Sequence, residues 1–410
     1  MKVAYRTIGL LLIAFCMTCT TDYPVDVPVI PPLPALDAVP DISKPLMEGV
    51  YTIPTGGRFG DDAVVKWSTK YVSIFTRTAY MILETGTKDS ILFMRGYWRV
   101  PTSDDMGLVD LVIAKNEGAS SLLKGIMPAS LTIRGRYGQQ NNPANTNISF
   151  VFSRTFSATV TSKKFLIVGH RGGGRTSDRL PISENSTAMI GYAERFGANG
   201  VEIDVRLTKD KIPVLYHDDD INIRLTQKGP LNGPISNFTY IQLLTFVELI
   251  RGEEIPTLRA ALKFAIDNTQ LEFVWLDTKD PEVVSYTIPI QREMLQYAAS
   301  KGRTIDILIG VPADDVLAAV KSMPDYTNIP TLCEISPEEA RLLNSKAWGP
   351  RWTLGTQNDL VASVQADGIK ALCWTIDVPA YINQYIHQGR FDGLLTNYPS
   401  YVAYYHYIRE

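Results

Sequence analysis

The stretch FLIVGHRGGGRTSDRLPISENSTAMIGYAERFGANGVEIDV, residues 165–205, decides the fold of this chain. Its apolar run at 165–170 predicts a buried strand, and a second apolar run at 201–205 predicts another. The segment 185–196 between them has the spacing of apolar residues that is typical of a helix. A strand, a helix and a second strand in this order indicate a βαβ unit with parallel strands.

The same alternation continues to the end of the chain. Further strands are predicted at 271–278, 304–311, 328–335, 351–354, 371–376 and 393–396. Further helices are predicted at 257–268, 282–300, 313–322, 337–345, 359–366, 379–387 and 400–408. Eight strand–helix units in about 250 residues are typical of an α/β TIM barrel. A strand-like piece at 212–216 and a long insertion to residue 254 follow the second strand, and we expect them at the face where barrel active sites lie.

Residues 48–160 have a different pattern, in which short runs of β-branched and aromatic residues alternate with turn-forming residues. These runs lie at 51–53, 63–67, 71–75, 80–83, 91–100, 108–114, 130–133 and 148–152. Frequent short strands predict an all-β domain, either a sandwich or a barrel. The aromatic residues Trp67, Tyr97 and Trp98 either pack in its core or form a platform for a sugar or a lipid.

The N-terminus has the features of an export signal. Lys2 and Arg6 precede a short apolar run at 8–15 that is too short to span a membrane. The cysteines that follow resemble those of a bacterial lipoprotein signal, and Cys19, after the small Thr18, fits that pattern better than Cys16. The resemblance implies an exported protein that is anchored to a membrane, facing the periplasm or the cell surface. The alternative is ordinary cleavage and secretion.

A proline-rich segment separates this signal from the first folded domain. Its prolines lie at positions 24, 28, 31, 32, 34, 40 and 45. Such a composition favours extended polyproline conformations, so the segment is either a tether or a linker that packs along the next domain. The predicted organisation is therefore a signal at 1–19, a proline-rich linker at 20–47, an all-β domain at 48–160 and a TIM barrel at 161–410.

Composition narrows the class of protein. The apolar content of 45% and charged content of 20% are typical of a globular protein, and the net charge is −3. No basic stripe or nucleic-acid motif is visible, so we expect no nucleic-acid partner. The remaining cysteines, Cys333 and Cys373, lie in apolar runs and are expected to be small buried hydrophobes rather than a disulfide framework or a zinc site.

Two acids on the second predicted strand indicate a metal site. Glu202 and Asp204 are two residues apart, so their side chains point to the same face of a strand. Two unpaired carboxylates inside a barrel would repel each other and would be costly to desolvate. A divalent cation resolves both problems, and oxygen ligands favour Mg²⁺ or Ca²⁺. The alternative is a pair of surface acids or of acids paired with lysine.

Groups that transfer protons and bind anions lie close to these acids in the sequence. Histidine side chains can exchange protons near neutral pH, so His170 and His217 are candidates for proton transfer, although each could instead be a structural histidine. Arg171 is suited to bidentate binding of a phosphate. The glycines at 172–174 allow a backbone to approach an anion, or they form a tight loop. Glu184 either favours a helix start or holds Arg171 in place.

Six segments together resemble the glycerophosphodiester phosphodiesterase family from about residue 163 to residue 410. They are GHRG at 169–172, EN at 184–185, VEIDVRLTKDKIPVLYHD at 201–218, IPTL at 255–258, CWTID at 373–377 and DGLLTNYP at 392–399. The family has a TIM barrel with an insertion after its second strand. The resemblance therefore implies the same barrel that the strand and helix pattern predicts.

The resemblance also implies residue roles. His170 and His217 match the acid–base histidines of the family. Glu202 and Asp204 match two of its metal-binding acids. Asp277, one methylene shorter, stands where the family usually has a third, glutamate ligand, and it should still coordinate the ion.

Other positions match the substrate-binding residues of the family. Arg171 and Lys279 match its phosphate-binding positive charges, and Glu184 matches a glutamate near the site. Trp374 matches an aromatic lining residue. Asn397 stands where family members often have aspartate.

The implied reaction is metal-dependent hydrolysis of a glycerophosphodiester to sn-glycerol 3-phosphate and an alcohol. A second hypothesis is a phospholipase D-like or phosphatidylinositol-cleaving activity on intact lipids. A third is a binding protein in which the all-β domain holds a glycan or a lipid. The small-molecule diester is the expected substrate, and the lipid anchor is the expected link to a membrane.

Overall fold

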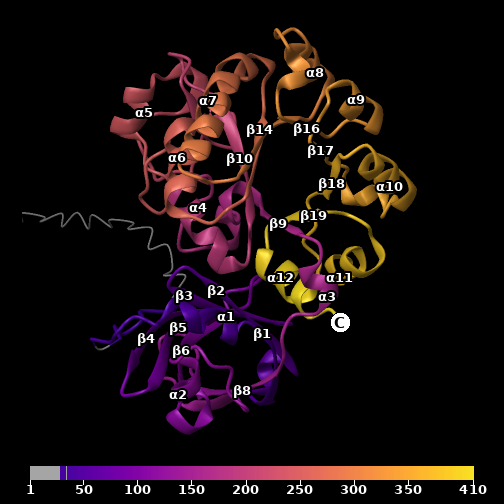
Figure 1. The fold of residues 1–410 in the computed structure, drawn as a ribbon. Helices are drawn as coiled ribbons and strands as arrows, with labels where there is room; N and C mark the ends of the chain where they lie inside the picture. Colours follow the sequence, from indigo (N-terminus) through magenta and orange to yellow (C-terminus); the bar gives the residue numbers. More distant parts are fainter. Residues whose placement is uncertain (1–27, 34) are drawn as a thin grey trace, which may run out of the picture.

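The computed structural model describes residues 28–33 and 35–410, which form two barrels in sequence (Figure 1). The N-terminal barrel contains antiparallel strands, and the C-terminal barrel alternates strands with helices. The predicted signal, with Cys16 and Cys19, lies outside the described residues. Within the described ranges, no helix combines the length and apolar character needed to cross a membrane.

The N-terminal barrel is a closed antiparallel meander. Its strands are β1 (Gly49–Thr55), β2 (Asp62–Ser68), β3 (Tyr71–Thr76), β4 (Tyr80–Lys88), β5 (Ile91–Arg99), β6 (Met106–Ile113), β7 (Thr132–Tyr137) and β8 (Thr146–Arg154). Each strand pairs with the next, and β1 pairs with β8 to close the barrel. The prediction of an all-β domain is thus confirmed, and its architecture is a barrel rather than a sandwich.

Side chains fill the interior of this barrel. Strand β6 alternates buried and partly buried residues along its whole length, as expected when one face points inward. Tyr51, Phe59, Trp98 and Phe150 are fully buried in the cluster that results. Trp98 also donates a hydrogen bond from Nε1 to the carbonyl of Gly138 at 2.8 Å. Trp98 therefore packs in the core of the barrel, which is one of its two expected roles.

Part of the proline-rich segment lies against the N-terminal barrel. Asp37 pairs with Thr87 of β4 through backbone hydrogen bonds, and Val39 and Met47 are buried in the barrel's core cluster. The last residues before β1 form a 3₁₀ turn, η1 (Asp41–Ser43), and a one-turn helix, α1 (Lys44–Met47). Residues 37–47 thus pack along the next domain, which is the alternative to a free tether.

The C-terminal barrel is built from parallel strands. They are β9 (Leu166–Gly169), β10 (Gly200–Leu207), β14 (Phe273–Thr278), β15 (Asp306–Val311), β16 (Thr331–Cys333), β17 (Ala347–Trp348), β18 (Lys370–Cys373) and β19 (Gly393–Thr396). Each is parallel to its neighbour, and β9 pairs with both β10 and β19, so the sheet closes. The predicted TIM barrel is confirmed.

Helices follow the strands around the outside of the barrel. They are α4 (Thr187–Ala193), α6 (Leu258–Asn268), α7 (Pro281–Ser300), α8 (Asp314–Lys321), α9 (Pro337–Leu342), α10 (Asn358–Ala366), α11 (Pro379–Gln388) and α12 (Pro399–Tyr407). Short helices also occur at α2 (Ala119–Leu122) and α3 (Ala158–Thr161), in the N-terminal barrel and before β9. Most of these helices start at a Ser, Thr or Asp cap or have proline in the first turn, which are ordinary helix-starting signals.

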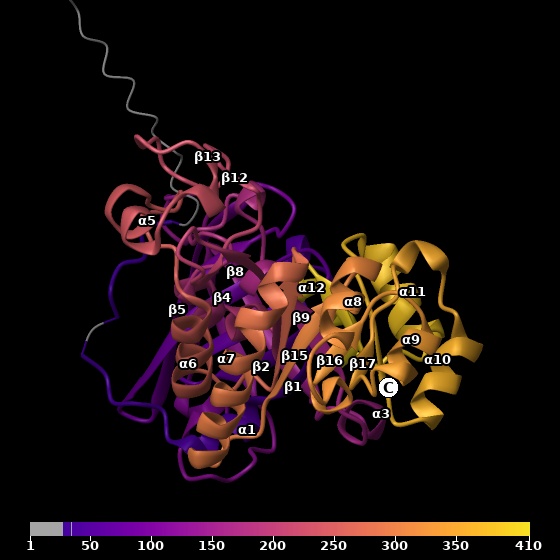
Figure 2. The same ribbon diagram turned by 90° about the horizontal axis from the view of Figure 1, so that it is seen from above.

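The insertion after the second barrel strand forms a small lobe of its own. Strand β11 (Pro213–Leu215) pairs antiparallel with β10, and β12 (Asp220–Ile221) pairs with β13 (Gly233–Pro234). Helix α5 (Tyr240–Phe246) completes the lobe. Figure 2 shows β12, β13 and α5 together at one side of the molecule.

One predicted strand is wrong. The sequence indicated a sixth barrel strand at 351–354, but the structure has β17 at Ala347–Trp348 and a 3₁₀ turn at Trp352–Leu354. Gly349 and Pro350 separate the two, and proline lacks the N–H that a strand ladder requires. Trp352 is only partly buried and Leu354 is 63% exposed, so this segment lies outside the barrel wall.

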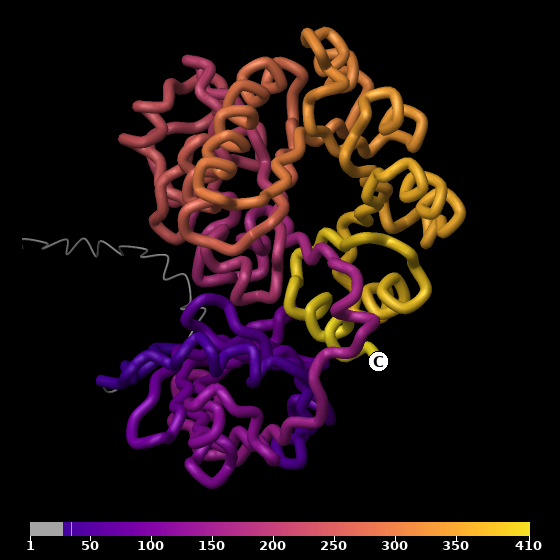
Figure 3. The backbone as a smooth tube through the Cα atoms, in the orientation of Figure 1, coloured from indigo at the N-terminus to yellow at the C-terminus, as the bar shows by residue number. Residues whose placement is uncertain are grey.

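The two barrels share one continuous hydrophobic cluster. Phe75, Tyr80 and Tyr97 of the N-terminal barrel belong to the same cluster as Phe196 and Tyr401 of the C-terminal barrel. The rings of Tyr80 and Phe196 meet edge to face at 5.5 Å. Figure 3 shows the backbone of the two barrels side by side, with the C-terminus at their boundary.

Candidate active site

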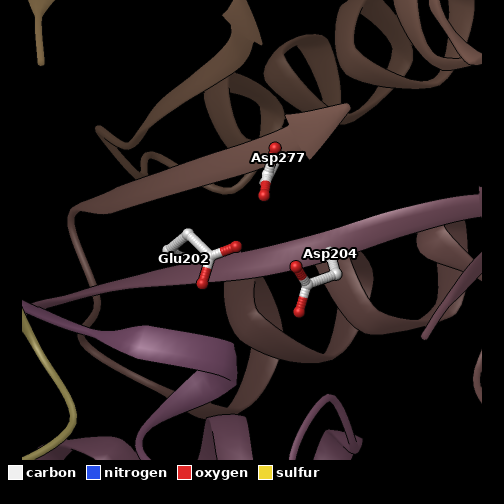
Figure 4. Close-up of side chains that lie close together, drawn as sticks. All are labelled: Glu202, Asp204 and Asp277. Atoms are coloured by element: carbon white, nitrogen blue, oxygen red, sulfur yellow. The ribbon is translucent and has the colours of Figure 1, made fainter. Parts of the chain in front are cut away.

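Three carboxylates meet at the mouth of the C-terminal barrel. Glu202 and Asp204 lie on β10, and Asp277 lies on β14, directly opposite Asp204 in the parallel register. One oxygen from each acid lies within 4.8 Å of the others. Figure 4 shows the three side chains turned toward one another. The i, i+2 spacing on β10 and the pairing of β10 with β14 together produce this cluster.

The acids strongly influence one another's charge. Burial raises the pKa of Glu202 well above its usual value, and the charges of Asp204 and Asp277 raise it further. Burial also raises the pKa of Asp277. Burial acts on Asp204 in the same direction, but the positive charge of Lys279 outweighs it and holds the pKa at about 2. Lys279 contacts both aspartates, with Nζ 2.7 Å from Oδ1 of Asp204.

This donor set fits a hard divalent cation. All three candidate ligands are carboxylate oxygens, which Mg²⁺ and Ca²⁺ prefer. Oε1 of Glu202 is buried and accepts no hydrogen bond from any residue that the structure describes. A buried carboxylate oxygen in this condition is costly unless a cation compensates it. Lys279 partly compensates the two aspartates, so the expected alternative of acids paired with lysine also describes part of the site.

His170 is oriented by an amide. It follows β9, and its Nδ1 lies 2.8 Å from Oδ1 of Asn397. The Asn397 amide is itself held by Asp377, because its Nδ2 donates to Oδ2 of Asp377 at 2.6 Å. Asn397 therefore presents its oxygen to His170, which assigns the ring proton to Nδ1 and leaves a lone pair on Nε2.

Burial keeps His170 neutral. It lowers the pKa of His170 to about 4, and the positive charge of Arg171 acts in the same direction. The imidazole is therefore unprotonated at neutral pH. Its Nε2 lies 3.7 Å from Oε2 of Glu202, which places the lone pair beside the acid cluster. His170 is thus able to accept a proton there.

His217 has a carboxylate partner instead. It follows β11, and its Nδ1 lies 2.7 Å from Oδ1 of Asp218. Burial tends to raise the pKa of Asp218, but hydrogen bonds from Arg224 and His217 outweigh it and hold this pKa well below its usual value. Arg224 belongs to the insertion, so the insertion helps to orient His217. Nε2 is the ring atom left to act on a substrate.

Arg171 is held in an unusual backbone conformation. Its φ of 55° and ψ of 37° lie in the left-handed region, which costs energy for a residue with a side chain. The backbone N–H of Arg171 donates to Oε2 of Glu202 at 2.8 Å, and its guanidinium donates to Oε1 of Glu184 at 2.8 Å. The buried Nε of Arg171 makes no hydrogen bond to the described part of the chain. Glu184 was expected either to favour a helix start or to hold Arg171, and the structure shows the contact with Arg171.

Sequence reasoning missed three residues that support this site. Asn185 donates to Oδ2 of Asp204 at 2.7 Å and accepts from the N–H of Asp204 at 3.0 Å. Asp377 holds Asn397, and Asp218 holds His217. All three lie within the quoted motifs, next to or near a residue to which a role was given. Asp218 directly follows His217, so that contact was open to sequence reasoning. The contacts of Asn185 with Asp204 and of Asp377 with Asn397 join residues about 20 positions apart, and the sequence pattern did not indicate them.

A cavity of about 400 Å³ connects the predicted residues. His170, Arg171, Glu202, His217, Asp277, Lys279 and Trp374 all line it. Asp204 and Glu184 lie just behind this lining and are buried. The structure therefore brings every predicted residue of the barrel to one place, as expected when side chains follow the carboxyl ends of barrel strands.

The wall of the cavity also contains an acid, Glu334, that sequence reasoning did not single out. Glu334 follows β16, and burial together with the charge of Asp277 raises its pKa well above the usual value. Arg351, on the same wall, places its guanidinium 5.0 Å from the ring centroid of Trp374. Glu334 stands in no quoted motif, but it lies at the end of the strand predicted at 328–335, and the ends of barrel strands are where site residues gather.

Known proteins resemble the barrel that carries this site. The model of the Glycerophosphoryl diester phosphodiesterase family matches residues 170–401. A glycerophosphodiester phosphodiesterase from Caldanaerobacter subterraneus subsp. tengcongensis is 27% identical over 245 residues, covering 58% of this chain and 95% of that protein. The human glycerophosphocholine phosphodiesterase GPCPD1 is 35% identical over 104 residues, covering 22% of this chain and 15% of that protein.

A solved structure shows a similar span. The crystal structure of a glycerophosphodiester phosphodiesterase from Parabacteroides distasonis has 25% sequence identity and a TM-score of 0.46, and the match covers 58% of this chain and 96% of that one. The family model covers more than half of the chain and contains both histidines and all three acids of the cluster. The chain therefore belongs to the glycerophosphoryl diester phosphodiesterase family, whose members are enzymes that hydrolyse glycerophosphodiesters.

Proposed function

We propose that this enzyme cleaves its diester by acid–base catalysis, in which His170 and His217 each exchange a proton with the reacting oxygens. A divalent cation bound by the three acids assists the reaction. The observation that carries the proposal is the convergence of two differently oriented histidines and the acid cluster in one cavity. His170 has a free lone pair on Nε2, whereas His217 has a carboxylate behind its ring. Groups with different environments are suited to opposite roles in acid–base catalysis.

His170 is the proposed base. Its neutral Nε2 accepts a proton from the attacking oxygen, which comes from water or from a neighbouring hydroxyl of the substrate. As the new P–O bond forms, the bond to the leaving alkoxide breaks. His217, supported by Asp218, donates a proton to that alkoxide. If a hydroxyl of the substrate attacks, water then opens the cyclic phosphate that forms, with the two proton transfers reversed, and gives sn-glycerol 3-phosphate.

Positive charges stabilise the phosphate during this step. The buried Nε of Arg171 makes no hydrogen bond to the described residues, and its Nη1 donates to Glu184. Lys279 lies between Asp204 and Asp277 at the edge of the cavity. Both charges are placed to balance the negative charge that develops on the phosphate oxygens.

Glu202, Asp204 and Asp277 are the proposed cation ligands, and the ion is Mg²⁺ or Ca²⁺. When bound, a divalent cation withdraws charge from the phosphate and lowers the pKa of an attacking oxygen. Asp277 is shorter than the glutamate expected there, yet one of its oxygens lies within 4.8 Å of the other ligand oxygens. The shorter side chain therefore still reaches the cluster.

The test is release of sn-glycerol 3-phosphate from glycerophosphocholine and glycerophosphoethanolamine. EDTA should abolish release, and Mg²⁺ or Ca²⁺ should restore it. His170→Ala and His217→Ala should each lower kcat by about 10²–10⁴-fold, because each removes one proton-transfer group. Both variants should keep the wild-type melting temperature within a few degrees.

Retained turnover in both histidine variants would refute the two-histidine mechanism. Tyr286→Phe, at a partly exposed position of α7 outside the cavity lining, is the control and should keep the wild-type activity. The last comparison measures cleavage of phosphatidylcholine and phosphatidylinositol in vesicles. Faster cleavage of vesicle lipids than of the deacylated diesters would instead favour the phospholipase D-like or phosphatidylinositol-cleaving activity.

Export and lipid anchoring at Cys19 form a further part of the proposal. The support is the sequence pattern of charged residues, a short apolar run and a cysteine within residues 1–19. Cys19→Ala should abolish incorporation of labelled fatty acid and release the protein from the membrane fraction. Cys16→Ala is the matched control and should leave both unchanged; the reverse pattern would move the anchor to Cys16.

A further inference from the structure

We propose that Arg99 of the N-terminal barrel is a positioning residue for the active-site loop after β9. The N-terminal barrel then contributes to the geometry of the phosphate site. Arg99 is the last residue of β5, and its side chain is only 1% exposed. It lies more than 70 residues away in sequence from the loop that it contacts. The inference rests on the proposed role of Arg171 in binding phosphate.

Arg99 binds the end of a turn in that loop. Its guanidinium donates to the carbonyl of Asp178 at 2.7 Å and to the carbonyl of Arg179 at 3.2 Å. These carbonyls end the 3₁₀ turn η5 (Thr176–Asp178), where no further helical N–H is available to them. A cation at the C-terminal end of a helical turn satisfies such carbonyls and complements their partial negative charge.

The turn that Arg99 binds also holds Arg171. The N–H of Thr176 donates to Oε2 of Glu184 at 2.7 Å, and Glu184 accepts through Oε1 from Arg171 at 2.8 Å. Oγ1 of Thr176 accepts from the N–H of Glu184 at 3.2 Å. Arg99 thus fixes one end of a three-residue turn whose other end orients the acid behind the phosphate-binding arginine.

A second set of contacts leads from the same turn toward His170. The carboxylate of Asp178 accepts two hydrogen bonds from Arg175 at 2.9 Å, and one from the hydroxyl of Tyr398 at 3.0 Å. Tyr398 directly follows Asn397, the residue that orients His170. Movement of the turn would therefore disturb both the arginine and the histidine of the site.

The two barrels pack closely at this point. Tyr80 and Pro101 of the N-terminal barrel and Gly173 and Asn397 of the catalytic barrel line a space of only about 20 Å³. A buried arginine is costly unless its donors find acceptors, and truncation would leave two carbonyls without their partner. The interface therefore depends on Arg99 at the end of the barrel where the site lies.

Arg154 provides a matched control. It is the last residue of β8, and it donates to the carbonyls of Ile408 at 2.6 Å and Arg409 at 3.3 Å. Both carbonyls follow α12, at the C-terminal end of the chain, whereas the carbonyls that Arg99 binds lie in the loop after β9. Arg154 and Arg99 make the same kind of contact between the barrels, but Arg154 touches no active-site loop.

The experiment first compares three single variants in the full chain: Arg99→Met, Arg99→Lys and the control Arg154→Met. It then combines Arg99→Met or Arg154→Met with Arg171→Met, which is also measured alone. Arg99→Met should lower kcat/KM for glycerophosphocholine by roughly 10²-fold, since small displacements of catalytic groups cost about this much. Arg99→Lys should recover part of the loss, because an ammonium can reach one carbonyl. Arg154→Met should stay within about twofold of wild type.

The double variants separate positioning from general destabilisation. If Arg99 acts through Arg171, its loss should cost much less once Arg171 is already absent. Additive losses for Arg99→Met and Arg171→Met, or equal kcat/KM for Arg99→Met and Arg154→Met, would overturn the inference. An unchanged kcat/KM in Arg171→Met alone would instead refute the proposed phosphate site. If Arg99→Met does not fold, Arg99→Lys carries the same comparison.

Discussion

At the residue scale, single contacts decide which atom of each catalytic group is available. The Asn397 amide points its oxygen at His170 because Asp377 occupies the other side of the amide. An asparagine at position 397 can therefore accept from His170 and donate to Asp377 at the same time. An aspartate there would place a second carboxylate against Asp377, and two carboxylates in contact cannot both ionise easily.

Removal of the Asn397 amide should therefore slow the reaction. We expect Asn397→Leu to lower kcat by about 10²-fold, because His170 would lose the partner that fixes its tautomer and ring orientation. The steady-state kinetics of the purified variant give this value, and circular dichroism checks the fold. Gln365→Leu, far from the cavity, is the control. Wild-type kcat in Asn397→Leu would show that His170 needs no orienting partner.

The acid cluster supports a second prediction at this scale. A cation that binds the folded state stabilises it by about 2.7 kcal/mol at a hundred times its dissociation constant. We expect Mg²⁺ or Ca²⁺ to raise the melting temperature of the wild type but not that of Glu202→Gln. Because burial raises the pKa of Glu202, the neutral amide should not lower the stability without a cation. An equal cation-dependent rise in both proteins would place the ion elsewhere.

At the element scale, α12 connects the two barrels and contains a buried histidine. Burial, with the nearby charge of Arg409, lowers the pKa of His406 to about 3. Its ring stacks on Phe165 at 4.6 Å, and its Nδ1 accepts a hydrogen bond from Arg409 at 2.8 Å. The helix is buried along most of its length, so its packing tolerates no charge on this ring.

The sign of the pH effect follows from this shift. Below about pH 6.5 the unfolded chain binds a proton at His406, but the folded chain does so only near pH 3. This contribution to stability is therefore complete above about pH 6.5 and is lost as the pH falls toward 3, at about 1.4 kcal/mol per pH unit. His406→Phe keeps the stacking and removes the titration.

Melting temperatures between pH 8 and pH 5 test this expectation. The wild type should lose more stability than His406→Phe as the pH falls below 6.5. Burial and the charge of Arg409 also lower the pKa of His387 on α11, but by less, so His387→Phe should reduce the pH dependence less than His406→Phe does. If the melting temperatures of the wild type and of His406→Phe fall equally with pH, His406 has the same pKa in the folded and in the unfolded chain.

At the scale of the whole molecule, the shared cluster should make the two barrels unfold together. Tyr80 is 2% exposed and packs on Phe196 across the boundary. Tyr80→Ala should lower the free energy of unfolding by about 3–5 kcal/mol, as for other large buried aromatic residues. Calorimetry of the full chain should show one transition in the wild type. Tyr286→Ala, at a side chain 37% exposed, should change stability by no more than about 0.5 kcal/mol.

Two separate transitions in the wild type would contradict this coupling. They would also mean that the N-terminal barrel can unfold while the catalytic barrel stays intact. Such a result would leave the Arg99 contact as a local one, without support from the surrounding interface.

The sequence by itself determined an all-β domain, a TIM barrel and most of the site. Alternation of short β-branched runs with turns indicated the all-β domain, and alternation of strands with helices indicated the TIM barrel. The predicted site residues lie at or just beyond the ends of strands, and parallel strands in a closed barrel bring those ends together. Local pattern and spacing were sufficient for the elements, since strand period and strand direction are local properties. The roles of Asp277, Lys279 and Trp374 were implied by the resemblance to a known family.

Tertiary structure alone decided what connects distant segments. It placed Glu334 in the cavity wall, Asn397 against His170 and Arg99 against the turn that orients Glu184. It also chose a closed barrel over a sandwich, and a loop over a strand at 351–354. These features depend on which side chains meet across large separations in the chain, and periodicity along a sequence carries no information about such meetings.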